Sequence, residues 1–207
     1  MTDFFVFVGR APIATSLRAK RSNLVNKQKL GKLACVTRQS KYGVFVKEIQ
    51  QFIEYDELIN FLPHKGKMFL FLRVTQHDVN NHTITSEYDI TENCIFYEKE
   101  YDGVPSWAGF EFMAQGISAL TGITNTMKGR TPLPGFILSV MEFKADVGYL
   151  KNNTTIQMKI KEDFRDEENH IYRYICELYA KKGDENPSVT AKISVMETED
   201  VHALFGD

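Results

Sequence analysis

The chain has 207 residues, of which 43% are hydrophobic and 25% are charged, and its formal net charge at pH 7 is −2. This length and composition are typical of one domain with a sizeable core rather than two full domains, and the net charge does not indicate a nucleic-acid-binding protein. No apolar run approaches 18 residues, so no membrane-spanning helix is predicted.

The cysteines give a further limit on the class of protein. Cys35, Cys94 and Cys176 are odd in number and widely spaced, without a CxxC pair. This pattern predicts neither a disulfide framework nor a zinc site, and we predict no other metal and no cofactor. A protein of the reducing cytoplasm is expected.

Charge is divided unevenly along the chain. Residues 1–47 contain ten Lys or Arg and a single acid, Asp3, whereas the remainder contains 15 basic and 26 acidic residues. Such asymmetry can mark a nucleic-acid-binding arm or a targeting peptide, but this segment has no clear helical stripe and no secretory hydrophobic region. We therefore predict that residues 1–48 are a poorly ordered leader outside the fold and that residues 49–207 form a single domain.

Regular patterns of hydrophobic residues begin after this segment. YDELINFL, at 55–62, predicts a short helix, and MFLFLRV, at 68–74, has the length and composition of a strand. HTITSEYDI, at 82–90, alternates as a second strand after an Asn-Asn turn. A helix and a hairpin are thus expected before the central segment.

Four β-rich runs joined by short polar turns follow the central segment. They cover residues 135–147, 154–164, 170–182 and 188–198. Consecutive strands joined by short turns favour antiparallel pairing. The order predicts an α+β fold in which an antiparallel sheet wraps one helix.

The central segment, GVPSWAGFEFMAQGISALTG at 103–122, predicts that helix. Its apolar residues point in almost all directions around a helical wheel, so it should be buried nearly all round. Glu111, Gln115 and Ser118 share one stripe because they are spaced i, i+4 and i+7.

The polar stripe has two interpretations. It is either a narrow exposed edge or the lining of a pocket or interface, and its single charge, Glu111, favours the second. Burying an unpaired carboxylate costs several kcal/mol, so a carboxyl group retained in an apolar helix indicates a role in acid–base chemistry.

Two motifs together resemble a known family. INFLPHKGKMFLFLRV, followed about forty residues later by GVPSWAGFEFMAQGISALTG, is similar to the hot-dog-fold 3-hydroxyacyl-[acyl-carrier-protein] dehydratases, in particular the branch associated with aryl-polyene and related lipid pathways. The resemblance covers residues 55–198. It implies about six antiparallel strands around one long central helix, and dimers with the active-site tunnel between the subunits.

The resemblance also implies a mechanism. Dehydration needs a base for the proton next to the thioester carbonyl, an acid for the departing hydroxyl group, and donors for the enolate-like oxygen. FEFMAQG puts Glu111 in the place of the family's acid, with Gln115 one turn further on. The backbone N–H groups near Gly103 and Val104 and the helix start around Trp107 are the expected thioester-binding donors.

The base departs from the family pattern. No histidine lies between His82 and Glu111, and the place of the family's loop histidine falls at or near Tyr97. One hypothesis is a dehydratase whose base is Tyr97 or His64. Another is a non-catalytic hot-dog subunit that completes the site of an active paralogue, and a third is an acyl thioesterase.

The resemblance implies two kinds of partner. One is an acyl carrier protein, whose acidic surface would favour a basic tunnel mouth; Lys65, Lys67, Lys128 and Arg130 are the candidate residues. The other is a second hot-dog subunit in a homodimer or hetero-oligomer. The remaining histidines are expected to be solvent-exposed bystanders: His77, His82, His170 and His202.

Overall fold

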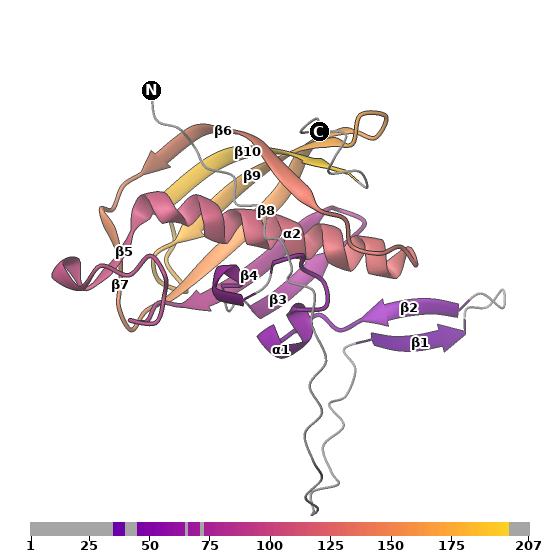
Figure 1. The fold of residues 1–207 in the computed structure, drawn as a ribbon, viewed down its shortest axis with the longest axis horizontal. Coiled ribbons are helices and arrows are strands. Elements are labelled where there is room, and N and C mark those ends of the chain that lie inside the picture. Colours follow the sequence, from indigo (N-terminus) through magenta and orange to yellow (C-terminus); the bar gives the residue numbers. More distant parts are fainter. Residues whose placement is uncertain (1–34, 40–44, 65, 71–72, 199–207) are drawn as a thin grey trace, which may run out of the picture. The chain divides into compact units, whose positions relative to one another are not determined.

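A computed structural model describes residues 35–39, 45–64, 66–70 and 73–198 (Figure 1). The chain divides into two units, Met1–Lys32 and Leu33–Asp207, and the described residues belong to the second. Strands β1 (Cys35–Gln39) and β2 (Phe45–Ile49) pair as an antiparallel hairpin. Regular structure therefore begins inside the segment 1–48, and the extent of a leader stays a prediction.

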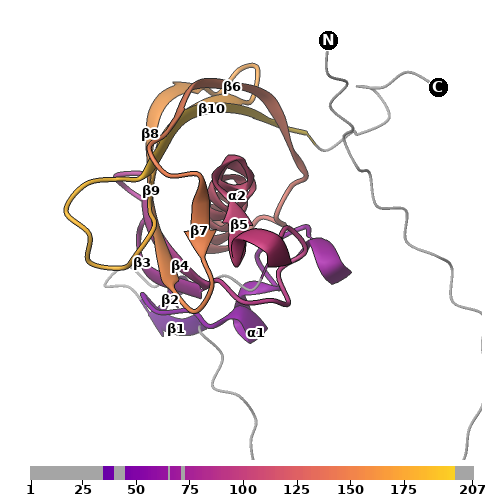
Figure 2. The ribbon, with the colours of Figure 1, turned by 90° about the vertical axis from the view of Figure 1, so that its left-hand side faces the viewer.

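The main element is a six-stranded sheet in the order β3-β4-β8-β9-β10-β6, with every neighbouring pair antiparallel. It curls around the long helix α2 (Gly109–Met127), as the view along the helix shows (Figure 2). The predicted α+β architecture is confirmed. The strands are β3 (Arg73–Asp78), β4 (Thr83–Asp89), β6 (Gly135–Ala145), β8 (Thr155–Asp166), β9 (Ile171–Tyr179) and β10 (Val189–Glu197).

The core lies between this sheet and α2. Alternate residues of β8, including Ile156, Met158 and Ile160, are buried, as are those of β9 and β10, because successive side chains of a strand point to opposite faces. A Cβ added at Gly116 would lie 2.5 Å from Ile160 Cδ1. Helix and sheet therefore approach more closely there than a larger helical residue would permit.

The predicted strand at 68–74 is confirmed at Arg73 and Val74, which lie in β3, and is wrong for residues 68–70; residues 71–72 lie outside the described ranges. A short helix α1 (Tyr55–Leu58) and a 3-10 turn (Gly66–Met68) precede β3. Phe69 and Leu70 are buried within a loop, so their hydrophobicity reflects packing against the core. An apolar run of this length does not distinguish a strand from a buried loop.

The segment before the central helix also differs from its prediction. Residues 103–105 form a short strand, β5 (Gly103–Pro105), which pairs with β7 (Tyr149–Lys151), and a 3-10 turn (Ser106–Ala108) leads into α2. A further 3-10 turn covers Lys99–Tyr101. The helix begins later and ends later than the predicted 103–122.

The two edges of the sheet differ. At the β3 edge, Ile53 exchanges backbone hydrogen bonds with Val74, and Gln51 Oε1 accepts the backbone N–H of His77. The β6 edge has no strand beside it among the described residues. Large apolar side chains are exposed along β6: Ile137, Leu138, Val140, Met141 and Phe143.

A polar residue is buried on the face of the sheet that points away from α2. A Cβ added at Gly116 of the helix would lie 3.3 Å from Ser86 Oγ, so Ser86 faces the helix. The next residue of β4, Glu87, therefore faces the other way, yet only 3% of its side chain is exposed.

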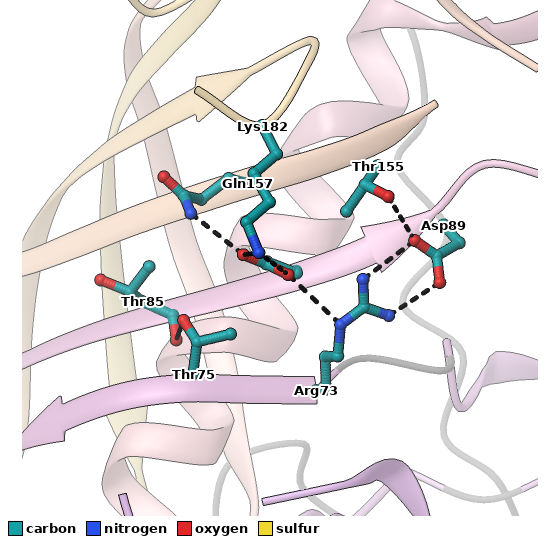
Figure 3. Close-up of polar contacts among 8 residues, drawn as sticks. Arg73, Thr75, Thr85, Asp89, Thr155, Gln157 and Lys182 are labelled. Carbon is teal, nitrogen blue, oxygen red and sulfur yellow. Dashed lines mark hydrogen bonds and ion pairs between the residues drawn. The ribbon is translucent and has the colours of Figure 1, made fainter. Parts of the chain in front are cut away.

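Glu87 is covered by a network of charged and amide groups, which includes the side chains labelled Arg73, Gln157 and Lys182 in Figure 3. Lys182 Nζ lies 2.9 Å from one carboxylate oxygen, and Gln157 and Arg73 donate at 3.1 and 3.3 Å. Arg73 also donates two hydrogen bonds to Asp89, at 2.7 and 2.9 Å. The network joins β3, β4 and β8 to the turn between β9 and β10.

Within the described ranges, neither α2 nor any shorter helix has the length and apolarity of a membrane span.

Candidate active site

Glu111 lies in the first turn of α2 and is half-buried. Among the described residues, the only hydrogen-bond partner of its carboxylate is Gln115, whose Nε2 donates to Oε1 at 2.8 Å. The i, i+4 spacing brings these side chains together on one side of the helix. One carboxylate oxygen is therefore engaged and the other is not.

Gln115 is fully buried, unlike its two neighbours on the predicted stripe. Its Oε1 accepts the backbone N–H of Leu70 at 3.1 Å, and its Nε2 also donates to the carbonyl of Met68 at 2.7 Å. Glu111 and Ser118 remain half-buried. Of the three residues of the stripe, Gln115 is therefore buried, whereas Glu111 and Ser118 lie nearer the surface.

His64 belongs to a segment that runs beside α2. At one end of this segment, a Cβ added at Gly122 would collide with the Phe61 carbonyl, and at the other end Met68 contacts Gln115. His64 lies between these contacts in the chain and is half-buried. Gly122 is about 16 Å along the helix axis from Glu111, at 1.5 Å per residue.

Tyr97 has the geometry of a hydrogen-bond donor. Its hydroxyl group donates to Asp102 Oδ1 at 2.7 Å, and this hydrogen bond raises the pKa of Tyr97 to about 12. A general base must be able to accept a proton near the working pH. The contact with Asp102 therefore does not favour Tyr97 as the base.

Gly103 and Val104 pack tightly in β5. A Cβ added at Gly103 would lie 2.5 Å from the carbonyl oxygen of Leu150, and Val104 is fully buried. The N–H of Gly103 bonds to the Glu98 carbonyl at 3.4 Å. Gly103 is therefore packed against the backbone of β7, and its N–H already has an acceptor.

Trp107 is the most exposed large apolar residue among those described, at 53%. Its ring contacts Phe96 edge-on, with the centroids 5.8 Å apart. It lies in the 3-10 turn immediately before α2, four residues from Glu111. An exposed aromatic surface therefore adjoins the start of the helix.

Two of the predicted bystander histidines are less exposed than expected. His77 is buried in β3, where its Nε2 lies 3.0 Å from the Gln50 carbonyl, so the prediction of an exposed side chain is wrong. His82 is half-buried, and its Nδ1 lies 3.0 Å from Arg165. His170 is exposed as expected, and His202 lies outside the described residues.

Of the candidate basic residues, the structure describes the side chains of Lys128 and Arg130. Lys128 and Arg130 are exposed at the C-terminal end of α2, about 25 Å along the axis from Glu111. Lys65 and the side chain of Lys67 lie outside the described residues. Lys128 and Arg130 therefore lie at the opposite end of α2 from Glu111.

Met68 and Leu70 are the contributors that sequence reasoning missed. Both act through backbone groups, which carry no residue-specific signal, and the run that contains them was predicted to be a strand. Within the described part of INFLPHKGKMFLFLRV, Phe61, Met68 and Leu70 contact the central helix.

Comparison with protein families gives one match. The sequence model of the ApeP-like family, described as ApeP dehydratase, matches residues 57–206. Among curated proteins, none matches this sequence.

Solved structures with a similar fold include the dehydratase heterocomplex ApeI:P from Xenorhabdus doucetiae. It has a TM-score of 0.62 and 16% identity, covering 71% of this chain and 94% of that one. A hypothetical thioesterase with coenzyme A from Streptococcus pneumoniae has a TM-score of 0.46 and 9% identity, covering 61% and 85%. The PaaI protein of the phenylacetic acid degradation operon of E. coli has a TM-score of 0.46 and 6% identity, covering 61% and 79%. The first of these likenesses supports the hot-dog fold.

Proposed function

Because the chain belongs to the ApeP-like dehydratase family, we propose that it takes part in eliminating water from a 3-hydroxyacyl thioester carried by an acyl carrier protein. The products are a 2-enoyl thioester and water. The setting is aryl-polyene or related lipid synthesis, as the sequence resemblance implies. Two buried free thiols, Cys94 and Cys176, favour the reducing cytoplasm.

Glu111 is the proton donor in this proposal. A base removes the proton from the carbon next to the carbonyl, and that electron pair forms the new double bond. The hydroxyl group on the next carbon leaves with a proton from Glu111 and becomes water. The observation that carries the assignment is a half-buried carboxyl group with Oε1 held by Gln115 and Oε2 left for a substrate hydroxyl.

The base is supplied by a partner hot-dog subunit. The sequence has no histidine between His82 and Glu111, and the hydroxyl group of Tyr97 donates a hydrogen bond to Asp102. The heterocomplex of the similar ApeI:P structure supports a pairing of unlike subunits. This chain then contributes the acid to a composite site.

The edge of β6 is where the partner docks. An exposed edge strand with apolar side chains is a ready template for pairing with another chain, and β6 has this character over 11 residues. The opposite edge is already occupied by residues 51–53. One edge of the sheet therefore remains for a second subunit.

The test is formation of a 2-enoyl thioester from a 3-hydroxyacyl carrier-protein thioester. The chain is assayed alone and after mixing with a catalytic hot-dog dehydratase subunit. Glu111→Gln keeps the shape of the side chain but cannot donate the proton, so activity of the complex should fall about a hundredfold or more. Glu185→Gln, at an exposed turn, is the matched control and should keep full activity.

The alternatives give different results. If the chain is a non-catalytic subunit, Glu111→Gln will fold, assemble and support full activity of the complex. If it is a thioesterase, free acid and thiol will appear in place of the 2-enoyl thioester. Thermal unfolding of each variant separates a chemical loss from a loss of folded protein.

A further inference from the structure

Gln115 has the contacts of an amide locked in one orientation. It is fully buried, both hydrogens of Nε2 are used, one on Met68 O and one on Glu111 Oε1, and Oε1 accepts the Leu70 N–H. Flipping the amide would bring Oε1 against two acceptors and Nε2 against a donor. The network therefore allows only one placement of the nitrogen that faces Glu111.

We propose that Gln115 is a positioning residue. The backbone groups of Met68 and Leu70 hold its amide, and the amide sets the orientation of the Glu111 carboxylate. Resting on the proposed function, this assigns a role to the loop at 66–70. The loop acts through the backbone N–H of Leu70 and the carbonyl of Met68. It holds the amide, and the amide holds one carboxylate oxygen so that the other keeps a fixed direction.

In this arrangement, both sequence motifs contribute to the positioning of Glu111. The first motif contains Met68 and Leu70, and the second contains Glu111 and Gln115. A carboxylate on a free side chain samples several rotamers, and a displacement of about 1 Å can cost about a hundredfold in rate. A hydrogen-bonded support that is itself buried reduces this freedom.

The kinetic test uses Gln115→Met, which has a similar length but makes none of the three hydrogen bonds. With the full chain in the active complex and a 3-hydroxydecanoyl carrier-protein thioester as substrate, kcat should fall about 10- to 100-fold with KM almost unchanged. The double variant Glu111→Gln/Gln115→Met should be no slower than Glu111→Gln alone, because Gln115 acts through Glu111.

Thr124→Val is the matched control for a change within α2. Thr124 is buried, and its hydroxyl group donates to the Leu120 carbonyl at 2.8 Å, about 20 Å along the helix from Glu111. This variant should keep kcat. A Gln115→Met variant with the parent's kcat, or a double variant in which the two losses multiply, would overturn the proposal.

A second measurement does not depend on activity. In the parent, both side-chain amide protons of Gln115 should give low-field NMR signals that exchange slowly with water, and Glu111→Ala should move one of them upfield. Signals unaffected by Glu111→Ala overturn the positioning role. If these signals respond but the parent complex dehydrates nothing, the proposed function fails while the hydrogen-bonded support of Glu111 stands.

Discussion

Glu87 illustrates how a charged residue can be stable on the outer face of the sheet. Burial by itself would raise its pKa, but hydrogen bonds from Lys182 and Gln157 and the nearby charge of Arg73 hold the pKa below its usual value. The ionised form is therefore more stable in the folded protein than in the unfolded chain. The neighbouring Asp89, hydrogen-bonded to Arg73, has a pKa of about 2.

The sign of these shifts predicts an acid-sensitive fold. A carboxylate with a lowered pKa stabilises the protein above its unfolded pKa, near 4.5 for Glu87, and loses that effect as the pH falls through the folded value. Glu87→Gln should lower the free energy of unfolding at pH 7 by about 1–3 kcal/mol, because a buried charge-assisted network is interrupted.

Chemical denaturation between pH 7 and pH 2.5 checks this prediction. The decline in stability on acidification should be smaller in Glu87→Gln than in the parent, whereas Glu168→Gln, on an exposed turn, should follow the parent. Parallel curves for Glu87→Gln and the parent would show that the network adds no net stability.

At the candidate site, the sequence predicts the positions of Glu111 and Gln115 but not their different environments. Helical spacing places both on one side of α2 because that relation is local. The burial of Gln115 depends on Met68 and Leu70, more than forty residues away, so the pattern within the helix could not reveal it.

Among the elements, β6 carries the clearest prediction. Leu138 is 48% exposed on this edge strand, so Leu138→Lys should weaken association about 10- to 100-fold by placing a charge in an apolar contact. Sedimentation velocity measures the shift from assembly to single chains.

The matched control lies on the other edge of the sheet. Gln76→Lys introduces the same side chain at an exposed position of β3, beside the segment 51–53, and should leave assembly unchanged. If both substitutions weaken association equally, the second subunit does not dock preferentially at the β6 edge.

The elements themselves were predictable to different degrees. Over most of their length, strands β8, β9 and β10 alternate buried residues with half-buried or exposed ones, and this period is visible in the sequence. Phe69 and Leu70 were assigned to a strand because they are apolar, but tertiary contacts place them in a loop. Strand β7 has only three residues, too few for a periodic signal.

For the whole molecule, we predict that the basic leader is dispensable. A chain starting at Leu33 should keep the midpoint of thermal unfolding and the assembly state of the full chain, since the preceding segment has a large excess of positive charge and no periodic hydrophobic pattern. A second chain, starting at Glu48, lacks most of the β1–β2 hairpin. Differential scanning calorimetry compares the three.

The two truncations locate the end of the leader. If both behave as the full chain does, the boundary at residue 48 stands. Loss of cooperative unfolding only in the shorter chain would assign the hairpin to the fold, and loss in both would show that residues 1–32 contribute to the core.

The unequal edges of the sheet have a consequence for stoichiometry. A subunit with two open edges can add neighbours without limit, as in a filament. Here Ile53 exchanges backbone hydrogen bonds with Val74, and Gln51 accepts the backbone N–H of His77, so we expect edge pairing once per chain, through β6. In the proposed assembly, growth stops at two subunits, and an excess of either subunit would leave single chains in solution in place of polymers.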